Sequence, residues 1–455
     1  MIRGAGERWR TTVRAWRAIL VLVLLLLGAT ARPLLAQGLI RDAEVEAELR
    51  RIAEPIFLAA GLDPDSVRIY MINDPTLNAF VAGGQNLFIH TGLILRTETP
   101  DQLAGVIAHE TGHIAGGHLS RSRDAMSQAQ TESIIGALLG AAAMVAGAPQ
   151  VCTAIIAGGA TVAERNLLKF SRGQEQAADQ AAIRYLAAED LPPTGLAEFF
   201  RILENQNLRI SAEGPSYLRT HPLTRDRIAF VDNEAARSPY AGRTYPPDLE
   251  AEHARVRAKL EGFLLDPVEV IQRNSGDTSN ERYARAVALF RRGETDRALE
   301  LVDGLISERP DDPYLHELRG QVLFESGRVA EAVEPYRVAL AGRADSALIR
   351  FGLARALLEE PNPDSVGEAA ALLREVVRVE PENAFAWRFL GVAEGRLGHP
   401  GRASLALAEN AVLLRRPEDV ELYLRRARQY VQPGDPEWFH LQDLQNAAGR
   451  LAEAG

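Results

Sequence analysis

The feature that most restricts the fold of this 455-residue chain is a repeat in its C-terminal half. Gly293 and Gly327 lie 34 residues apart, and Gly398 follows after two more periods plus an insertion of three residues. Small residues recur at two fixed positions of the period. They are Ala286, Gly320, Ala354 and Gly391 at the first position, and Ala298, Ala332, Ala369 and Ala403 at the second. Small residues kept in phase allow two helices to touch closely within each unit.

A period of 34 residues with this pattern predicts tetratricopeptide repeats, in which each unit is a pair of helices. One pair cannot bury its apolar face alone, so neighbouring pairs stack into a curved solenoid. Four units are visible, and residues 420–455 resemble a further, degenerate helix pair. The concave surface of a solenoid predicts that the repeats bind an extended protein segment. The alternative is that these helices only cap the first half of the chain.

The N-terminus has the composition of an export signal. Residues 1–17 carry five arginines and one glutamate, and an apolar run of 11 residues follows at 18–28. A bilayer span needs roughly 20 apolar residues, so this run is too short to cross comfortably. A basic start, a short apolar run and small residues afterwards predict a secretory signal peptide over residues 1–36, cleaved after Ala36. An uncleaved membrane anchor is the alternative. We expect the mature chain to be exported into an oxidising compartment, either free or peripheral to the membrane.

Charge and cysteine content exclude several classes of protein. The chain has 51 basic and 61 acidic residues, a net charge of −10, so it lacks the basic surface of a nucleic-acid-binding protein. Removal of residues 1–36 takes away six arginines and one glutamate, which leaves 45 − 60 = −15. One cysteine, Cys152, rules out a disulfide framework within the chain. The polar segment 274–280 predicts a boundary between a first domain at 37–273 and the repeats at 274–455.

The first domain reads as a mixture of strands and helices. Short strands are expected at residues 66–70, 79–82 and 86–90, with a hairpin turn at Gly83-Gly84. The edge of this strand pair could accept an extended substrate strand. Thr99-Pro100 predicts the start of a helix whose body runs through residue 119. A second helix is expected at residues 171–189, because Pro192-Pro193 follows it.

The chemistry of the first domain lies in the sequence His-Glu-Thr-Gly-His at residues 109–113. His109 and His113 are four residues apart, so both imidazoles lie on one face of a helix and can bind one zinc ion. Glu110 can accept a proton from the water that attacks the substrate. The flanking residues are apolar, as expected of a buried active-site helix, which favours a metal site over a chance match.

A catalytic zinc ion normally has three protein ligands, so a third is required. On a continuous helix His118, five residues after His113, would point away from the ligand face; it reads as a neighbour of the site or a charge at the end of the helix. Glu175 is a better candidate, and Asp179 four residues later could orient a ligand imidazole. Taken alone, Glu175 could equally be a solvated helix residue.

Three segments together resemble a known family. HETGH at 109–113, SRGQEQAAD at 171–179, and Thr220-His221-Pro222 with Arg227 look like the gluzincin family of the CaaX prenyl proteases and the heat-shock HtpX proteases. With the signal peptide and the repeats, the chain is similar to the BepA type of Gram-negative bacteria. The resemblance covers nearly all of the mature chain, and its motifs are specific only in combination.

This resemblance implies a mainly α-helical chain, with a gluzincin-type α+β zinc peptidase domain followed by an α-solenoid. It implies that His109, His113 and Glu175 bind one Zn²⁺ ion per chain and that Glu110 is the general base. His221 is expected near the metal, where it would either occupy the open metal position or stabilise the tetrahedral intermediate. BepA-type members degrade misassembled outer-membrane proteins and help others to assemble.

The expected function is therefore that of a periplasmic zinc endopeptidase in envelope quality control. Its substrates would be unfolded or misassembled envelope proteins, and its repeats would bind a substrate or the outer-membrane assembly machinery. The alternative is a tetratricopeptide scaffold or chaperone whose peptidase site is latent. Residues 134–163 are apolar and contain small residues; they fit buried helices beside the site, a hairpin in contact with a membrane or partner, or a membrane insertion.

Overall fold

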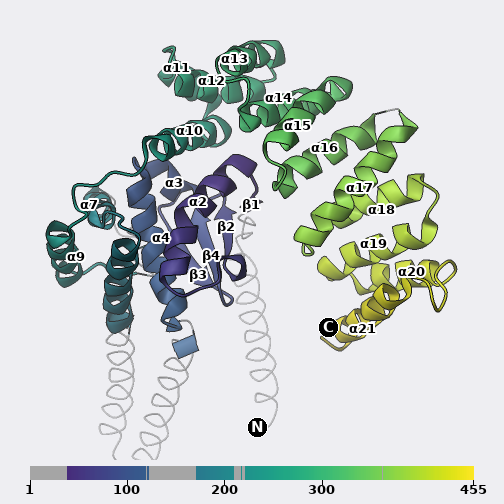
Figure 1. The fold of residues 1–455 in the computed structure, drawn as a ribbon, viewed down its shortest axis with the longest axis horizontal. Coiled ribbons are helices and arrows are strands. Elements are labelled where there is room, and N and C mark those ends of the chain that lie inside the picture. Colours follow the sequence, from purple (N-terminus) through teal and green to yellow (C-terminus); the bar gives the residue numbers. More distant parts are fainter. Residues whose placement is uncertain are drawn as a thin grey trace, which may run out of the picture.

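The computed structural model describes residues 38–118, 120–121, 171–209, 217, 221–360 and 362–454. These residues form a first domain with one small sheet surrounded by helices, followed by an array of helix pairs (Figure 1). The predicted signal peptide, the apolar segment 134–163 and Cys152 lie outside the described residues. Within the described ranges, no helix is both long and apolar enough to cross a membrane.

The sheet of the first domain has four strands in the order β1-β2-β4-β3. The strands are β1 (Leu39–Ile40), β2 (Arg68–Ile72), β3 (Ala79–Ala82) and β4 (Asn86–His90). β2 runs parallel to β4, and the other two pairings are antiparallel. The predicted hairpin is confirmed, since Gly83 and Gly84 join β3 to β4 at φ angles of 59° and 101° that favour glycine.

One predicted strand begins later than expected. We predicted a strand at residues 66–70, but β2 covers Arg68–Ile72. The cause is a 3₁₀ turn, η1 (Pro64–Ser66), which Asp63 caps by accepting a hydrogen bond from the Asp65 backbone. The strand β1 was not predicted, because two residues show no periodicity.

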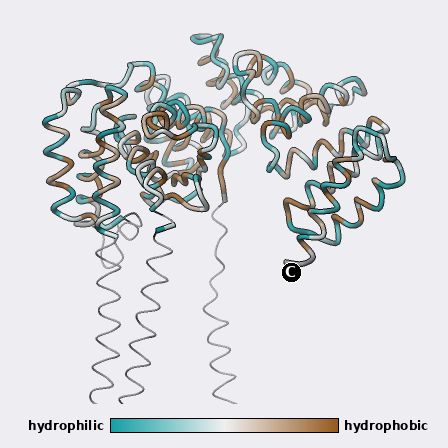
Figure 2. Tube along the Cα trace, turned by 60° about the horizontal axis from the view of Figure 1, so that its bottom comes forward, coloured by the Kyte–Doolittle hydropathy of each residue, from teal (hydrophilic) through white to brown (hydrophobic). Residues whose placement is uncertain are grey.

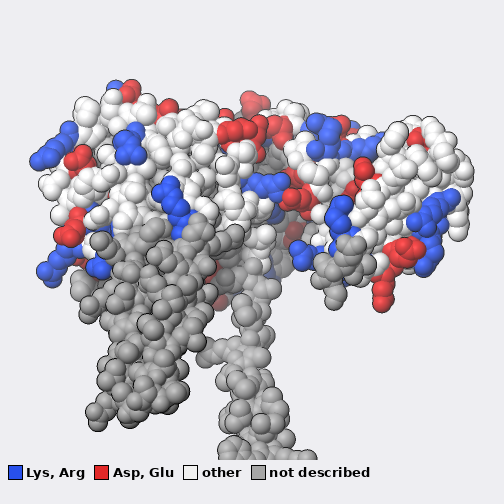
Figure 3. Space-filling model, turned by 90° about the horizontal axis from the view of Figure 1, so that it is seen from below, with Lys and Arg blue, Asp and Glu red and all other residues white. Residues whose placement is uncertain are grey.

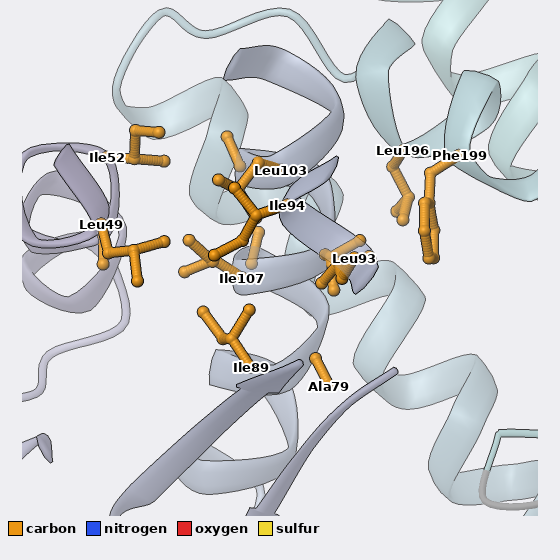
Figure 4. Packing of buried hydrophobic residues seen from close by; sticks show 14 of the residues in the cluster. Leu49, Ile52, Ala79, Ile89, Leu93, Ile94, Leu103, Ile107, Leu196 and Phe199 are labelled. Atoms are coloured by element: carbon orange, nitrogen blue, oxygen red, sulfur yellow. The ribbon is translucent and has the colours of Figure 1, made fainter. Parts of the chain in front are cut away.

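Helices enclose the sheet and carry most of the core. They are α2 (Ala43–Ala59), α3 (Thr91–Arg96), α4 (Pro100–Ala115), a helix at residues 171–188, α7 (Thr194–Arg209), α9 (Arg225–Arg237) and α10 (Pro247–Leu264). α4 contacts α2, α7 and β3. Leu103 and Ile107 of α4 pack in a fully buried cluster with Ile89 of the sheet, Leu49 of α2 and Phe199 of α7 (Figure 4). This core fixes α4, the helix that carries HETGH.

The central helix α4 is shorter than predicted. It begins at Pro100, where the missing N–H costs nothing, and it ends at Ala115 rather than near residue 119. Gly117 adopts a φ of 60°, a left-handed conformation that stops the helix. The helical body therefore carries both HETGH histidines, while His118 lies beyond the break.

The second half of the chain confirms the predicted repeat. Its helices are α11 (Pro267–Arg273), α12 (Ser279–Arg291), α13 (Thr295–Glu308), α14 (Pro313–Glu325), α15 (Val329–Gly342), α16 (Ala347–Glu359), α17 (Pro363–Val379), α18 (Ala384–Arg396), α19 (Pro400–Leu413), α20 (Pro417–Ala427) and α21 (Trp438–Ala454). Gly293, Gly327 and Gly398 separate the two helices of their pairs at φ angles of 76°, 80° and 78°. A side chain at Gly320 would meet the Tyr336 ring at 2.9 Å. The recurring glycines thus provide turns and close helix contacts.

Apolar and polar positions alternate along the helices of the repeats (Figure 2). A cluster of buried residues runs from Ala258 of α10 to Ala406 of α19. The surface carries charges of both signs, and acidic and basic side chains are interspersed over the face shown in Figure 3. The described residues on that face present no extended basic patch.

Buried charges join the first domain to the repeats. The Lys259 ammonium of α10 is inaccessible to solvent and lies 2.8 Å from Asp42, 3.3 Å from Glu44 and 3.5 Å from Glu317 of α14. Tyr283 of α12 donates a hydrogen bond of 2.7 Å to Glu44. The predicted domain boundary, at residues 274–280, covers the connection between α11 and α12 and the first two residues of α12.

Candidate metal centre

Four side chains converge where α4, the helix at 171–188 and residue 221 meet. His109, His113, Glu175 and His221 each offer a ligand atom, and these atoms all lie within 4.8 Å of one another. The Nε2 atoms of His109 and His113 are 3.1 Å apart. Glu175 places its carboxylate oxygens 3.5 Å from His109 Nε2 and 3.4 Å from His113 Nε2. The structure therefore brings together all three predicted ligands and His221.

Close helix packing creates this convergence. A Cβ atom at Gly112 would lie 3.0 Å from the Cα and the carbonyl oxygen of Ala178. The glycine inside HETGH therefore lets the helix at 171–188 approach α4, and Glu175 lies one turn before Ala178. The sequence analysis assigned no role to Gly112.

Glu110 lies beside the four ligand atoms and is completely buried. Within the described part of the chain, neither of its carboxylate oxygens accepts a hydrogen bond. His221 Nε2 lies 3.4 Å from Glu110 Oε1. Burial raises the pKa of Glu110. A buried carboxylate without donors fits a place where water and a metal ion belong.

The donor set also fits a divalent metal ion. Three imidazoles and one carboxylate are the nitrogen and oxygen ligands found at zinc sites. His109 binds Asp179 through Nδ1, so its Nε2 atom is available to the cluster. The side chains of His109 and Glu175 are almost inaccessible, and His113 keeps only 11% of its side chain exposed. Burial of these polar groups without a partner ion would be costly.

Asp179 and Arg227 support the ligands from behind. Asp179 Oδ1 lies 2.9 Å from His109 Nδ1, the geometry that orients an imidazole. Arg227 donates two hydrogen bonds to the Asp179 carboxylate, at 2.7 and 2.8 Å. Its Nη1 atom lies 2.8 Å from Glu175 Oε2, and its guanidinium packs over the Phe200 ring. Sequence reasoning quoted Arg227 as part of a motif but missed this positioning contact.

His118 also approaches the site, for a reason that the sequence did not reveal. The expectation that it points away assumed a continuous helix, and this assumption is wrong because the chain turns at Gly117. His118 Nδ1 lies 3.0 Å from His113 Nδ1. Hydrogen bonding at Nδ1 leaves Nε2 of His113 facing the cluster. His118 is outside the set of four candidate ligands but contacts one of them, as expected of a neighbour of the site.

An aromatic residue that sequence reasoning did not single out holds His221. The Tyr217 ring stacks on the His221 ring with centroids 4.6 Å apart, and Phe199 packs against Tyr217 edge-on. The His221 backbone N–H donates a hydrogen bond of 2.8 Å to the Tyr217 carbonyl. A tyrosine four residues before the histidine was the only sequence signal for this contact.

The electrostatics of the site favour different protonation states for neighbouring groups. Burial lowers the pKa of His113 to about 3. Burial also acts to lower the pKa of His109, but hydrogen bonds to Asp179 and Glu175 outweigh it and raise the value to about 9. Burial opposes ionisation of Glu175, yet its histidine partners hold its pKa far below the usual range. These shifts favour an anionic Glu175 beside a neutral His113.

Comparison with known proteins gives consistent matches. Residues 40–235 match the model of Peptidase family M48, and residues 283–347 match a tetratricopeptide repeat model. The chain is 25% identical over 354 residues to the beta-barrel assembly-enhancing protease of Yersinia pestis, which covers 76% of this chain and 71% of that protein. The chain is 26% identical over 372 residues to the protease of the same name in Escherichia coli (strain K12), which covers 80% of this chain and 75% of that protein. Mitochondrial metalloendopeptidase OMA1 of Schizosaccharomyces pombe is 26% identical over 187 residues, which covers 40% of this chain and 50% of that protein. The four candidate ligands all lie inside the first matched range.

Proposed function

We propose that this metallopeptidase, whose family M48 domain at residues 40–235 is joined to tetratricopeptide repeats, is a zinc-dependent endopeptidase of the bacterial envelope. One observation carries the proposal. His109, His113, Glu175 and His221 converge within 4.8 Å beside Glu110, a buried carboxylate that accepts no hydrogen bond from the described residues. This arrangement offers metal ligands and a proton acceptor at one point.

Each side chain has a distinct role in the proposed reaction. His109, His113 and Glu175 would hold one zinc ion, which when bound supplies Lewis acidity to the attacking water and the substrate carbonyl. Glu110 accepts the proton of the attacking water and returns it to the leaving amine. Its raised pKa makes it a stronger base than an exposed glutamate. Asp179 holds His109 in the tautomer that presents Nε2.

The sheet suggests how a substrate reaches this site. β3 is the last strand in the order β1-β2-β4-β3, so one of its sides has no partner strand within the described sheet. An extended polypeptide can add to such an edge by backbone hydrogen bonds. Unfolded or misassembled proteins expose extended segments, which supports them as substrates.

Two further features support the proposed cellular location. The relatives in Yersinia pestis and Escherichia coli carry the name beta-barrel assembly-enhancing protease. The basic, then apolar, first 36 residues have the composition of an export signal. From these features we infer action in the periplasm on misassembled outer-membrane proteins. The repeats would bind a substrate or the assembly machinery, and residues 134–163 would provide any contact with the membrane.

The geometry around His221 supports a second candidate function. Its Nδ1 atom lies 3.2 Å from Glu175 and 3.4 Å from His109 Nε2, so its ring can occupy a fourth metal position. With four protein ligands no position remains for water, and the metal centre would be latent. The chain would then act mainly as a scaffold or chaperone through its repeats, with peptidase activity only when His221 moves away.

Glu110→Gln tests the proposed mechanism. The amide has the size of the carboxylate but cannot accept the proton, so we expect retained zinc and at least 100-fold slower cleavage of an unfolded protein. Zinc content by atomic spectroscopy and cleavage rate would be measured on the same preparation. Glu198→Gln, outside the four-ligand cluster, is the matched control. Undiminished cleavage by Glu110→Gln would contradict the mechanism.

A further inference from the structure

An arginine in the repeats lies among aromatic rings and has no acidic partner among the described residues. The Arg355 guanidinium of α16 is 4.6 Å from the ring centroid of Phe324 of α14, 5.9 Å from that of Phe351 and 5.8 Å from that of Phe389 of α18. Its Nε atom is buried without a hydrogen bond. Among the described residues no carboxylate lies within ion-pair distance of it. Most arginines of the repeats, in contrast, pair with an acid or a backbone carbonyl.

These contacts span the first helices of three successive pairs. α14 lies against α16, and α16 lies against α18, in the order seen along the array (Figure 1). The first helices therefore form one continuous face, and the stacked pairs of a solenoid present such a face as a binding surface. Arg355 lies in the middle of this face, between its two neighbouring helices.

The same face carries an apolar stripe that is open to solvent. On α18, Phe385 and Val392 lie four residues before and three residues after Phe389, so the three side chains share one side of the helix. Phe385 is 67% exposed and Val392 is 39% exposed. Exposed aromatic and aliphatic side chains beside an unpaired cation are typical of a peptide-binding surface. The stripe extends past Arg355 in both directions along α18.

We propose that this face binds an extended protein segment that carries an aspartate or glutamate between apolar side chains. The carboxylate would accept hydrogen bonds from the Arg355 guanidinium, whose plane the three phenylalanine rings hold in place. The apolar neighbours of the acid would pack on Phe385 and Val392. An internal acidic side chain fits better than a chain terminus, because the apolar stripe continues on both sides of Arg355.

Charge complementarity supports an acidic ligand. The whole chain has a net charge of −10, so most of its surface repels acidic peptides. An arginine in an apolar surface, without an acidic partner among the described residues, is therefore a local exception. It would select a ligand both by the negative charge of its acidic side chain and by the position of that side chain between apolar residues. The proposal deepens the binding role of the repeats, and so it rests on the proposed function.

The test is peptide binding by the full chain. The probe is an amidated, fluorescein-labelled ten-residue peptide with one aspartate between phenylalanine and leucine in a glycine-serine background. Fluorescence anisotropy is measured in the Glu110→Gln background, so that the probe is not cleaved. We expect Arg355→Gln to weaken binding about ten- to hundred-fold, the effect of losing a charged hydrogen bond. Arg337→Gln on α15, which breaks the exposed pair with Glu368 of α17, should leave the affinity unchanged.

A second probe with asparagine in place of aspartate completes a double-mutant cycle. The asparagine probe should bind the protein that keeps Arg355 as weakly as the aspartate probe binds Arg355→Gln. The substitution Arg355→Gln should not weaken binding of the asparagine probe further. Equal affinity for the two probes would overturn the proposal, as would full affinity in a folded Arg355→Gln. A concentration-dependent dimer that Arg355→Gln dissociates would also overturn it, because the face would then bind a second copy. The experiment measures binding alone, so its outcome does not depend on whether the peptidase mechanism is correct.

Discussion

Replacement of Asp179 by asparagine tests whether the buried support of the metal centre works as the structure indicates. Asp179 is inaccessible to solvent and has three contacts, with His109 Nδ1 at 2.9 Å and with Arg227 at 2.7 and 2.8 Å. Asparagine has the same shape but no charge, and its amide nitrogen cannot accept a hydrogen bond. Of its two carboxylate partners, the buried Arg227 would keep Glu175 at 2.8 Å, together with its hydrogen bond to the Pro222 carbonyl.

Two magnitudes follow from these contacts. Removal of one partner from a buried ion pair costs roughly 3–5 kcal/mol. We expect about 3 kcal/mol for Asp179→Asn, because Glu175 still neutralises Arg227 in part. Loss of the orienting hydrogen bond to a ligand histidine weakens metal binding by about 10- to 100-fold. Asp232→Asn, which breaks the exposed pair with Arg201 at 2.7 Å, should cost under about 1 kcal/mol and leave metal affinity unchanged.

The assay separates these effects. Urea unfolding of the metal-free protein gives the stability change, and titration with zinc in a competing chelator gives the affinity. Loss of stability with unchanged affinity would show that Asp179 only anchors Arg227. If Asp179→Asn is no less stable than Asp232→Asn and binds zinc equally well, the reasoning from burial and distance is wrong.

Two other perturbations test the site and the domain junction. His221→Ala should weaken zinc binding, because the ring belongs to the four-atom set; unchanged zinc affinity together with unchanged cleavage would contradict a role at the centre. Burial, opposed by Lys259, raises the pKa of Glu317 to about 7, so the folded protein holds this proton more tightly than the unfolded chain. The resulting contribution to the free energy of unfolding is fully present below the ordinary glutamate pKa of 4.5, and it is lost as the pH rises through about 7. Glu317→Gln should therefore reduce the fall in urea midpoint between about pH 5 and about pH 8, and an unchanged fall would refute this.

Features that follow local periodicity could be predicted from the sequence. The pair His109 and His113 and the 34-residue repeat both depend on spacing within helices, and the structure shows both. The hairpin at Gly83-Gly84 follows from the backbone freedom of glycine. Each of these features is decided by residues close together in the chain.

Features that depend on long-range packing could not be predicted in the same way. Nothing in the spacing showed that Arg227 would pair with Asp179, 48 residues earlier, while also reaching Glu175. The approach of His118 to His113 depends on one left-handed residue, Gly117, inside a sequence that reads as continuous helix. The resemblance to a family pointed to Glu175, whereas its sequence environment alone left a solvated glutamate equally acceptable.

The burial of Lys259 has a consequence for the evolution of the chain. Its three acidic neighbours come from both halves, Asp42 and Glu44 from the first and Glu317 from the second. Glu44 in turn needs the hydroxyl of Tyr283. A chain cut after residue 273 would expose this lysine and remove the Tyr283 donor from Glu44, which would keep its pair with Arg255. The two halves are thus not freely exchangeable modules: a different repeat array could be fused here only if it brought matching partners for these charges.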